Sequence, residues 1–519
     1  MQISKILTTN QLNGFPRFKL SVAGVGLVTT AVTLLTLFSA LFAAIQYATA
    51  GLIGNDGYYH IKIAYLMRQQ GLKPAFDALP LTILNSEAFY DHHFLYHVYL
   101  AVFAGIDPAV DGGLALTQSA KIASIFLPAF TFLAIWWLLR AQHVRWAAVW
   151  AIGLFAVSEA FLYRMSMPRA QALSLLLLIL AVHWLLQKRY WLLLPLGFVF
   201  VWAYNAFPLL LVVSGAYFLT ILLLERRIVW QAILFPLLGM LLGLLINPYF
   251  PENISFITSH LMPKIGESAT KVGNEWSPYK TETLIENSGF ALVAFILGVL
   301  ALGWHKERID KNSLFTLVLT LLFGYMLFKS RRFVEYFPPF ALIFFAFTLR
   351  PLLENWLQKV PAKQIKYLSF LPVLMLGLLI YPLFISIKDA RDLVDNSKPA
   401  TRYADASLWL RAQTEPGTMI FQTDWDDFTR LYFYNSDVIY TAGLDPTFLE
   451  LENPELFDEW VDITKGRVEN PGTEIRDQFN AEYVFSDLNH EIFLEMAQKD
   501  PSLVEVYRDE DAIIFSVLD

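Results

Sequence analysis

The chain has 519 residues, of which 56% are hydrophobic and only 16% are charged, and its formal net charge is −7. Soluble globular proteins typically have about 25% charged residues, so this composition argues against a soluble enzyme and predicts a membrane protein with several spans. The chain contains no cysteine, which excludes disulfides and thiolate chemistry.

Charge is divided unevenly along the chain. Residues 388–519 contain 29 acidic and 11 basic side chains, a net charge of −18, which leaves +11 for residues 1–387. We therefore expect a basic membrane domain, 1–387, followed by an acidic, water-soluble domain, 388–519. The negative charge of the second domain argues against nucleic-acid binding, which requires a basic surface.

Apolar stretches predict about eleven membrane-spanning helices in the first domain. The first stretch is too long for a signal-peptide core, so we expect it to be retained. Two long loops, 47–113 and 248–288, interrupt the series. The predicted spans lie near residues 22–46, 114–139, 146–162, 171–187, 190–205, 207–224, 229–247, 289–303, 313–328, 336–350 and 367–386.

The distribution of lysine and arginine indicates the orientation, because short cytoplasmic loops are rich in both. With a cytoplasmic N-terminus, most basic loops fall inside, and both long loops and the C-terminal domain fall outside. We expect a multi-pass protein of the plasma (inner) membrane with an extracytoplasmic C-terminal domain. Four arginines that fall outside depart from the pattern and suggest an anionic partner there: Arg164, Arg169, Arg331 and Arg332.

Helical and strand-like patches alternate in residues 388–519, which predicts a small α/β domain. A helix is expected at 401–411. Strands are expected at 418–422, 437–441, 483–487 and 512–517. The predicted fold is thus a polytopic α-helical membrane domain followed by a small α/β soluble domain.

The first long loop opens on Asp56, directly after the first span. A carboxylate at the mouth of a membrane helix is costly to desolvate, so we expect it to face water, a cation or a reaction centre. His60 follows one helical turn later, and Asp91 and His93 lie further along the same loop. These four residues are candidate ligands of a divalent cation such as Mg or Mn. The alternative is a set of interfacial polar residues that pack the loop against the membrane.

The second long loop carries Glu275, in the sequence Gly-Asn-Glu-Trp-Ser-Pro-Tyr. A loop with a carboxylate and aromatic residues could close over a bound substrate, or it could be an ordinary solvated loop.

Arg331 and Arg332 are adjacent at the expected outer end of a span. Guanidinium groups there suit a phosphate or pyrophosphate, which they bind bidentately. The alternative is that both side chains extend to lipid headgroups, with Glu335 as a local ion partner. Arg164 and Arg169 add positive charge on the same side of the membrane.

Asp424, Trp425 and Asp426 follow directly after a predicted strand of the soluble domain. Carboxylates around a tryptophan suggest a recognition site that combines polar contacts with stacking. The alternative is a turn in which Asp424 caps a helix.

The order of these motifs resembles that of the GT-C glycosyltransferases, and most closely the catalytic subunits of oligosaccharyltransferases. The matching parts are Asp-x-Tyr-Tyr-His at 56–60, a later outer loop with a glutamate, Arg-Phe-x-x-Tyr at 332–336 and a Trp-Asp pair at 425–426. The chain departs from this family at 424–428, which reads Asp-Trp-Asp-Asp-Phe rather than Trp-Trp-Asp-Tyr. It also lacks a second acidic motif, because residues 164–171 contain arginines in its place.

The resemblance implies roles for individual residues. Asp56 corresponds to the catalytic aspartate that helps to hold a divalent cation and to orient the acceptor, and Glu275 to the glutamate of the outer loop. Arg331 or Arg332 corresponds to the arginine near the donor phosphate. The residues at 424–426 stand where the family recognises its acceptor.

We therefore expect a membrane glycosyltransferase that moves a sugar or oligosaccharide from a polyprenyl-phosphate or polyprenyl-pyrophosphate donor. The acceptor would be a glycan, a lipid or a protein on the outer membrane face. One alternative is a non-catalytic membrane scaffold or sensor with an outer binding domain. Another is a secondary transporter, which would need inverted repeats and charged or broken helices at mid-membrane; the sequence shows neither.

Overall fold

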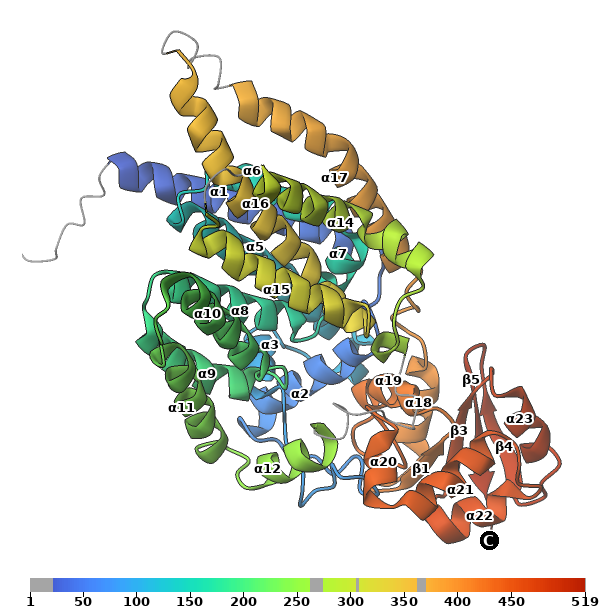
Figure 1. Ribbon diagram of the computed structural model, residues 1–519. Coiled ribbons are helices and arrows are strands. Elements are labelled where there is room, and N and C mark those ends of the chain that lie inside the picture. Colours follow the sequence, from blue (N-terminus) through green and yellow to red (C-terminus); the bar gives the residue numbers. More distant parts are fainter. Residues whose placement is uncertain (1–21, 262–273, 305–307, 362–369, 519) are drawn as a thin grey trace, which may run out of the picture.

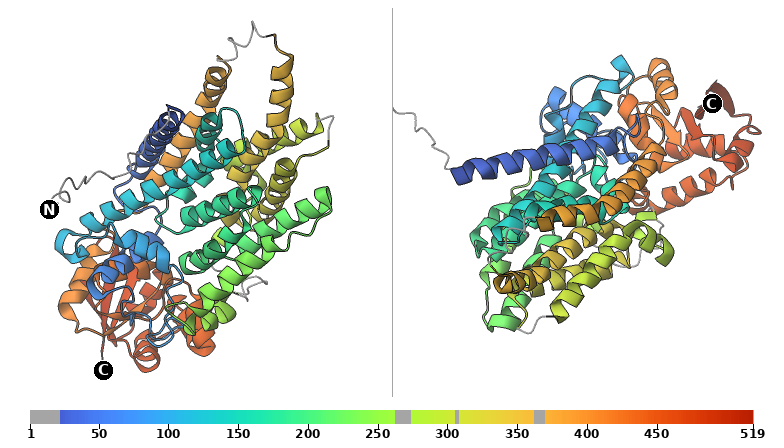
Figure 2. Two further views of the ribbon diagram at one scale, coloured as in Figure 1. Left: turned by 90° about the vertical axis from the view of Figure 1, so that its left-hand side faces the viewer. Right: turned by 90° about the horizontal axis from the view of Figure 1, so that it is seen from above.

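The protein consists of a large helical bundle and a smaller domain built on one sheet (Figure 1). The computed structural model describes residues 22–261, 274–304, 308–361 and 370–518. The smaller domain lies at one end of the bundle, as the two further views confirm (Figure 2).

Within the described residues, each predicted apolar stretch of the first domain contains a helix. The helices are α1 (Val22–Gln46), α5 (Leu114–Ala141), α6 (Ala147–Gly153), α7 (Glu159–Ser166), α8 (Gln171–Leu186), α9 (Leu193–Ala203), α10 (Leu209–Glu225), α11 (Gln231–Leu245), α14 (Thr281–Gly303), α15 (Lys311–Leu327), α16 (Phe337–Lys359) and α17 (Leu371–Asp395).

Fewer of these helices than predicted qualify as membrane spans by length and hydropathy. Within the described part of the chain, five are long and apolar enough: α1, α5, α14, α16 and α17. A sixth is possible if α6 and α7, which are bent by 91° at a short break, form one span. The remaining apolar helices have 10–17 residues, below the roughly 20 that a straight span requires. The structure therefore supports a multi-pass membrane protein, but the prediction of about eleven spans is not confirmed.

Glycine lets two of the shorter helices, α9 and α11, pack with their backbones in contact. A Cβ at Gly239 of α11 would collide with the carbonyl of Leu194 in α9. A Cβ at Gly243, one turn later, would lie 3.0 Å from the carbonyl oxygen of Phe198. Small residues four positions apart allow this close approach in membrane helices.

The two long loops are folded segments. The first contains α2 (Asp56–Gln70), α3 (Phe94–Ala101) and α4 (Pro108–Asp111). The second contains α12 (Glu252–Phe256), a π-helical turn (Ile257–Leu261) and the short 3₁₀ turn η4 (Asn274–Trp276). Residues 262–273 of the second loop lie outside the described residues.

The C-terminal domain is the expected small α/β domain. Its five-stranded sheet has the order β2-β1-β3-β5-β4, with β1 parallel to β2 and β3, and β5 antiparallel to β3 and β4. The predicted boundary at 387/388 falls inside α17, which continues to Asp395. The elements are α18 (Ala404–Gln413), β1 (Met419–Gln422), η7 (Trp425–Asp427), α19 (Phe428–Tyr434), β2 (Ile439–Tyr440), α20 (Thr447–Glu452), α21 (Pro454–Thr464), α22 (Pro471–Phe479), β3 (Tyr483–Asp487), α23 (Glu491–Ala497), β4 (Leu503–Arg508) and β5 (Ala512–Val517).

The first long loop shares a hydrophobic core with the C-terminal domain. The ring centroid of Tyr59 lies 6.1 Å from that of Tyr432 and 6.5 Å from that of Phe428. The backbone N–H of Tyr440 donates to the carbonyl of Ala78 at 2.8 Å. This packing places the start of α2 against the turn that follows β1, so that residues from both domains meet there.

Candidate active site

Asp56 is the first residue of α2, and local glycines bring it close to another segment of the bundle. Gly54 has a φ of +77°, in the left-handed region that favours glycine. A Cβ at Gly57 would collide with the ring of Pro168. The absence of that Cβ lets the first turn of α2 approach the segment after α7. As a result, Nη2 of Arg169 lies 2.6 Å from Oδ2 of Asp56.

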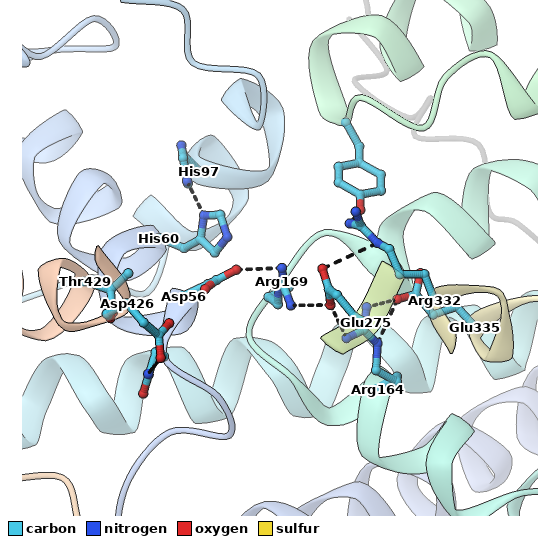
Figure 3. A network of polar contacts seen from close by, with 12 residues as sticks. Asp56, His60, His97, Arg164, Arg169, Glu275, Arg332, Glu335, Asp426 and Thr429 are labelled. Carbon is cyan, nitrogen blue, oxygen red and sulfur yellow. Dashed lines mark hydrogen bonds and ion pairs between the residues drawn. The ribbon is translucent and has the colours of Figure 1, made fainter. Parts of the chain in front are cut away.

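Three arginines converge on the single carboxylate of Glu275 (Figure 3). Its Oε2 lies 2.7 Å from Nη1 of Arg164 and 3.4 Å from Nη1 of Arg169. Its Oε1 lies 3.6 Å from Nε of Arg332. We call Arg164, Arg169, Arg332, Asp56, Glu275 and Glu335 the arginine–carboxylate cluster.

Four further contacts, two to Glu335 and two from Arg332, complete this cluster. Glu335 accepts hydrogen bonds from Nε of Arg164 at 2.9 Å and from Nη2 of the same guanidinium. Nη2 of Arg332 donates to the hydroxyl of Tyr204 at 2.9 Å, and its guanidinium stacks 4.5 Å from the ring of Trp276. Three guanidiniums therefore face three carboxylates, so the cluster is formally neutral.

The charges stabilise one another against the cost of burial. Burial alone would raise the pKa of Glu275, but the guanidiniums of Arg332, Arg169 and Arg164 lower it well below its ordinary value. Burial would lower the pKa of Arg169, but Asp56 and Glu275 raise it. The carboxylate of Glu275 is thus ionised and its three partners are protonated over the whole physiological range.

Arg331 lies outside this cluster, although it is adjacent to Arg332. Its guanidinium stacks 5.2 Å from the ring of Tyr279, and its Nε donates to the carbonyl of Pro278 at 3.3 Å. Arg331 and Arg332 belong to one 3₁₀ turn, Arg331–Glu335, and successive residues of such a turn point in different directions. Of the four arginines predicted to meet a phosphate, the structure brings together Arg164, Arg169 and Arg332.

A chain of hydrogen bonds links Asp91 to His60 through His97. Nδ1 of His97 lies 2.7 Å from Oδ2 of Asp91, and its Nε2 lies 2.7 Å from Nδ1 of His60. If the carboxylate of Asp91 accepts, neutral His97 donates from Nδ1 and accepts at Nε2. Nδ1 of His60 is then the donor to His97, and Nε2 of His60 keeps a lone pair. Burial, with His97 and Arg169, lowers the pKa of His60 well below its ordinary value.

The four candidate metal ligands do not form a metal site. Asp56 is bound to Arg169, whereas His60 and Asp91 are each bound to His97. The ring centroid of His93 lies 5.3 Å from that of Tyr204 and 4.7 Å from that of His60. Among the described residues, no three His, Asp or Glu side chains converge as ligands. In the described part of the chain, Asp56 is thus paired with a guanidinium, and the four predicted ligands are not brought to one point.

The turn after β1 contributes one of its three predicted residues to the site. Asp424 caps η7, since its Oδ1 accepts from the backbone N–H of Asp426 at 3.0 Å. Trp425 packs against the core of the C-terminal domain. Asp426 accepts a hydrogen bond from Nδ2 of Asn55. Burial, followed by the charges of Asp56 and Asp424, raises the pKa of Asp426, so this carboxylate lies within electrostatic reach of Asp56.

Sequence reasoning missed several residues of the site. Asn55 bridges the domains, because its Oδ1 also accepts from Nε of Arg430 at 3.1 Å. Tyr204 was not proposed as a site residue, His97 stood out only as a metal-capable histidine one helical turn after His93, and Glu335 was considered only as a local ion partner of Arg331 and Arg332. The sequence feature that could have identified two of them is their position: Asn55 directly precedes Asp56, and His97 lies one helical turn after His93.

No protein-family model and no curated protein matches this sequence. Several solved structures share its fold, and three proteins are among them. The archaeal oligosaccharyltransferase AglB from Archaeoglobus fulgidus, in complex with an inhibitory peptide and a dolichol-phosphate, has a TM-score of 0.64 at 13% identity, over 91% of this chain and 71% of its own. ArnT from Cupriavidus metallidurans, bound to undecaprenyl phosphate, has a TM-score of 0.56 at 14% identity, and the match covers 95% of this chain and 98% of ArnT.

The third is the arabinofuranosyltransferase AftD from Mycobacteria, with a TM-score of 0.56 at 14% identity over 95% of this chain and 40% of its own. All three are GT-C glycosyltransferases. The GT-C fold suggested by the motifs is therefore confirmed, at identities that establish the fold alone.

Proposed function

We propose that this protein is a GT-C glycosyltransferase that transfers a sugar or oligosaccharide from a polyprenyl-phosphate or polyprenyl-pyrophosphate donor. The observation that carries the proposal is the arginine–carboxylate cluster, which holds three guanidiniums and Asp56 together where the helical bundle meets the C-terminal domain. The fold supports it, because two proteins of the same fold were captured with dolichol-phosphate and undecaprenyl phosphate.

Arg164, Arg169 and Arg332 would bind the phosphate of the donor. A lipid-linked donor reaches the site through the bilayer with its anionic head at the membrane surface. Guanidiniums bind phosphate oxygens in a planar, bidentate geometry. When the bond from the sugar to the phosphate breaks, negative charge grows on the leaving phosphate, and fixed guanidiniums stabilise that charge without reorganising.

Asp56 would act on the acceptor, either as the general base or as the carboxylate that orients the attacking group. Asp426 lies within reach of the same position through Asn55, so the C-terminal domain would bring the acceptor to Asp56. The acceptor is a glycan, a lipid or a protein on the outer membrane face. The proposed mechanism uses side chains of the protein for each of these roles and includes no step on a metal ion.

The test is Asp56→Ala in purified protein reconstituted into liposomes with lipid-linked donors extracted from the native membrane. We expect transfer to fall by about 100-fold or more, the usual size of an acid–base contribution, while binding of the donor persists. Asp458→Asn, on an exposed position of α21, removes the same charge far from the site and serves as control.

Transfer by the Asp56→Ala variant at the wild-type rate would refute the proposed role of Asp56. A membrane scaffold or sensor would show no transfer in the wild-type protein either. Mass spectrometry of surface glycans and glycoproteins, with and without the gene, would identify the sugar and its acceptor.

A further inference from the structure

The three guanidiniums of the arginine–carboxylate cluster share one anion, the carboxylate of Glu275. Arg164 and Arg169 both approach its Oε2, at 2.7 and 3.4 Å, and Arg332 approaches Oε1 at 3.6 Å. A phosphate group with two free oxygens would engage the same three guanidiniums in the same way. The position that suits a ligand phosphate is therefore filled by a side chain of the protein itself.

Charge balance shows that a phosphate cannot simply be added. Arg164, Arg169 and Arg332 are balanced by Asp56, Glu275 and Glu335, so a further anion would meet no unbalanced positive charge within this described cluster. Like charges in a partly buried site repel strongly, because water screens them poorly. One of the three carboxylates must withdraw before an anionic ligand can bind.

Glu275 is the carboxylate best placed to withdraw. The side chain of Glu335 is only 2% exposed and bonds two nitrogens of Arg164. The side chain of Asp56 is more exposed than that of Glu275, at 33%, but it contacts only one arginine of the cluster, so its withdrawal would open Arg169 alone. The side chain of Glu275 is 26% exposed, and it alone contacts all three guanidiniums. Its departure would open one contact position on each of the three arginines at once, while Glu335 and Asp56 keep their own contacts.

The backbone around Glu275 is anchored independently of its carboxylate. The hydroxyl of Ser330 donates to the carbonyl of Glu275 at 2.9 Å, and the N–H of Arg331 donates to the carbonyl of Ser277 at 3.1 Å. Trp276 stacks on Arg332. Rotation of the side chain alone can therefore vacate the site while the turn stays in place.

We propose that Glu275 occupies the binding position of the donor phosphate and that the phosphate displaces it. This inference rests on the proposed function and adds an order of events to it. The phosphodiester or pyrophosphate of the sugar-linked donor takes the place of the carboxylate on the three guanidiniums. The displaced carboxylate becomes available to the acceptor, so Glu275 can assist transfer only when a donor is bound.

The test measures binding of two probes, inorganic pyrophosphate and farnesyl phosphate, to the full-length protein in detergent micelles by isothermal titration calorimetry. Glu275→Gln removes the competing charge but keeps the shape of the side chain. We expect it to bind both probes roughly tenfold more tightly than the wild type, while its transfer activity falls. Glu282→Gln, at an exposed position in the first turn of α14, makes the same change outside the cluster and should bind like the wild type.

Equal or weaker binding of both probes by Glu275→Gln would overturn the inference. If farnesyl phosphate binds the wild type and the variant equally, the displacement is wrong and the proposed donor site stands. If pyrophosphate binds more tightly to the variant and farnesyl phosphate binds to neither, the displacement stands and the proposed lipid donor fails. If Glu275→Gln does not accumulate in the membrane, Glu275→Asp carries the test, because its shorter side chain withdraws from the guanidiniums and should also tighten binding.

Discussion

Asp427 should make the protein less stable as the pH rises. It ends η7 in the C-terminal domain, its residue is 2% exposed, and its Oδ2 has no hydrogen-bond partner among the described residues. Burial, with the charges of Asp424 and Asp487, raises its pKa from 3.8 to about 7. The folded protein therefore keeps a proton on Asp427 that the unfolded chain has already released between about pH 4 and pH 7.

The magnitude follows from the shift. A difference of about three pH units, at about 1.4 kcal/mol per unit, makes the folded state lose up to about 4 kcal/mol between pH 4 and pH 7. Asp427→Asn replaces the carboxyl with a neutral group of the same shape and removes this loss. The stability advantage of the variant over the wild type should thus grow with pH across this window and stay constant above it.

Urea unfolding of the full-length protein in detergent micelles, followed by tryptophan fluorescence at pH 5, 6, 7 and 8, measures that difference. Comparing the variant with the wild type at each pH cancels the contributions of all other titrating groups. Asp458→Asn, on the exposed face of α21, is the matched control and should give a difference that does not change with pH. A pH-independent difference for Asp427→Asn would refute the reasoning, because it would mean that Asp427 titrates alike in both states.

Two further substitutions test the packing and the domain junction. Gly239→Ala places a Cβ against the carbonyl of Leu194, so it should push α11 away from α9 and destabilise the bundle by about 1–3 kcal/mol. Gly215→Ala, which meets open space, should leave the thermal unfolding midpoint unchanged. Equal midpoints for both variants would contradict the close contact. Asn55→Ala removes the hydrogen bond to Asp426. It should raise the KM for the acceptor several-fold and leave the affinity for the donor unchanged. An unchanged acceptor KM would show that this contact does not align the acceptor.

The secondary structure was largely predictable because buried segments consist of runs of hydrophobic residues that can be recognised in the sequence. Strands β3 and β5 begin and end where their runs of buried residues predict, at 483–487 and 512–517. Strand β4 was missed because it is an edge strand: of its six residues, Leu503–Arg508, only the first is buried. The number of spans was not predictable in the same way, since the hydropathy of a short helix does not reveal whether protein or lipid surrounds it.

The members of the site were easier to predict than their contacts. Asp56, Glu275 and Arg332 stood out as charges near span ends, but their partners are far away in the chain: Arg164 bonds Glu275 across 111 residues and Glu335 across 171. No local pattern encodes such pairs. Even adjacent residues differ, because a 3₁₀ turn directs Arg332 into the cluster and Arg331 away from it.

The arginines at 164 and 169 affect which charges of the site a ligand can replace. A divalent cation can be exchanged or chelated, whereas the guanidinium that binds Asp56 is covalently part of the chain and stays charged at any pH the protein meets. The positive charge of this site is therefore constant, and only its anions can be exchanged. If this is the donor site, as we propose, ligand binding is a competition between anions, and Glu275 is the internal competitor that the three arginines already hold.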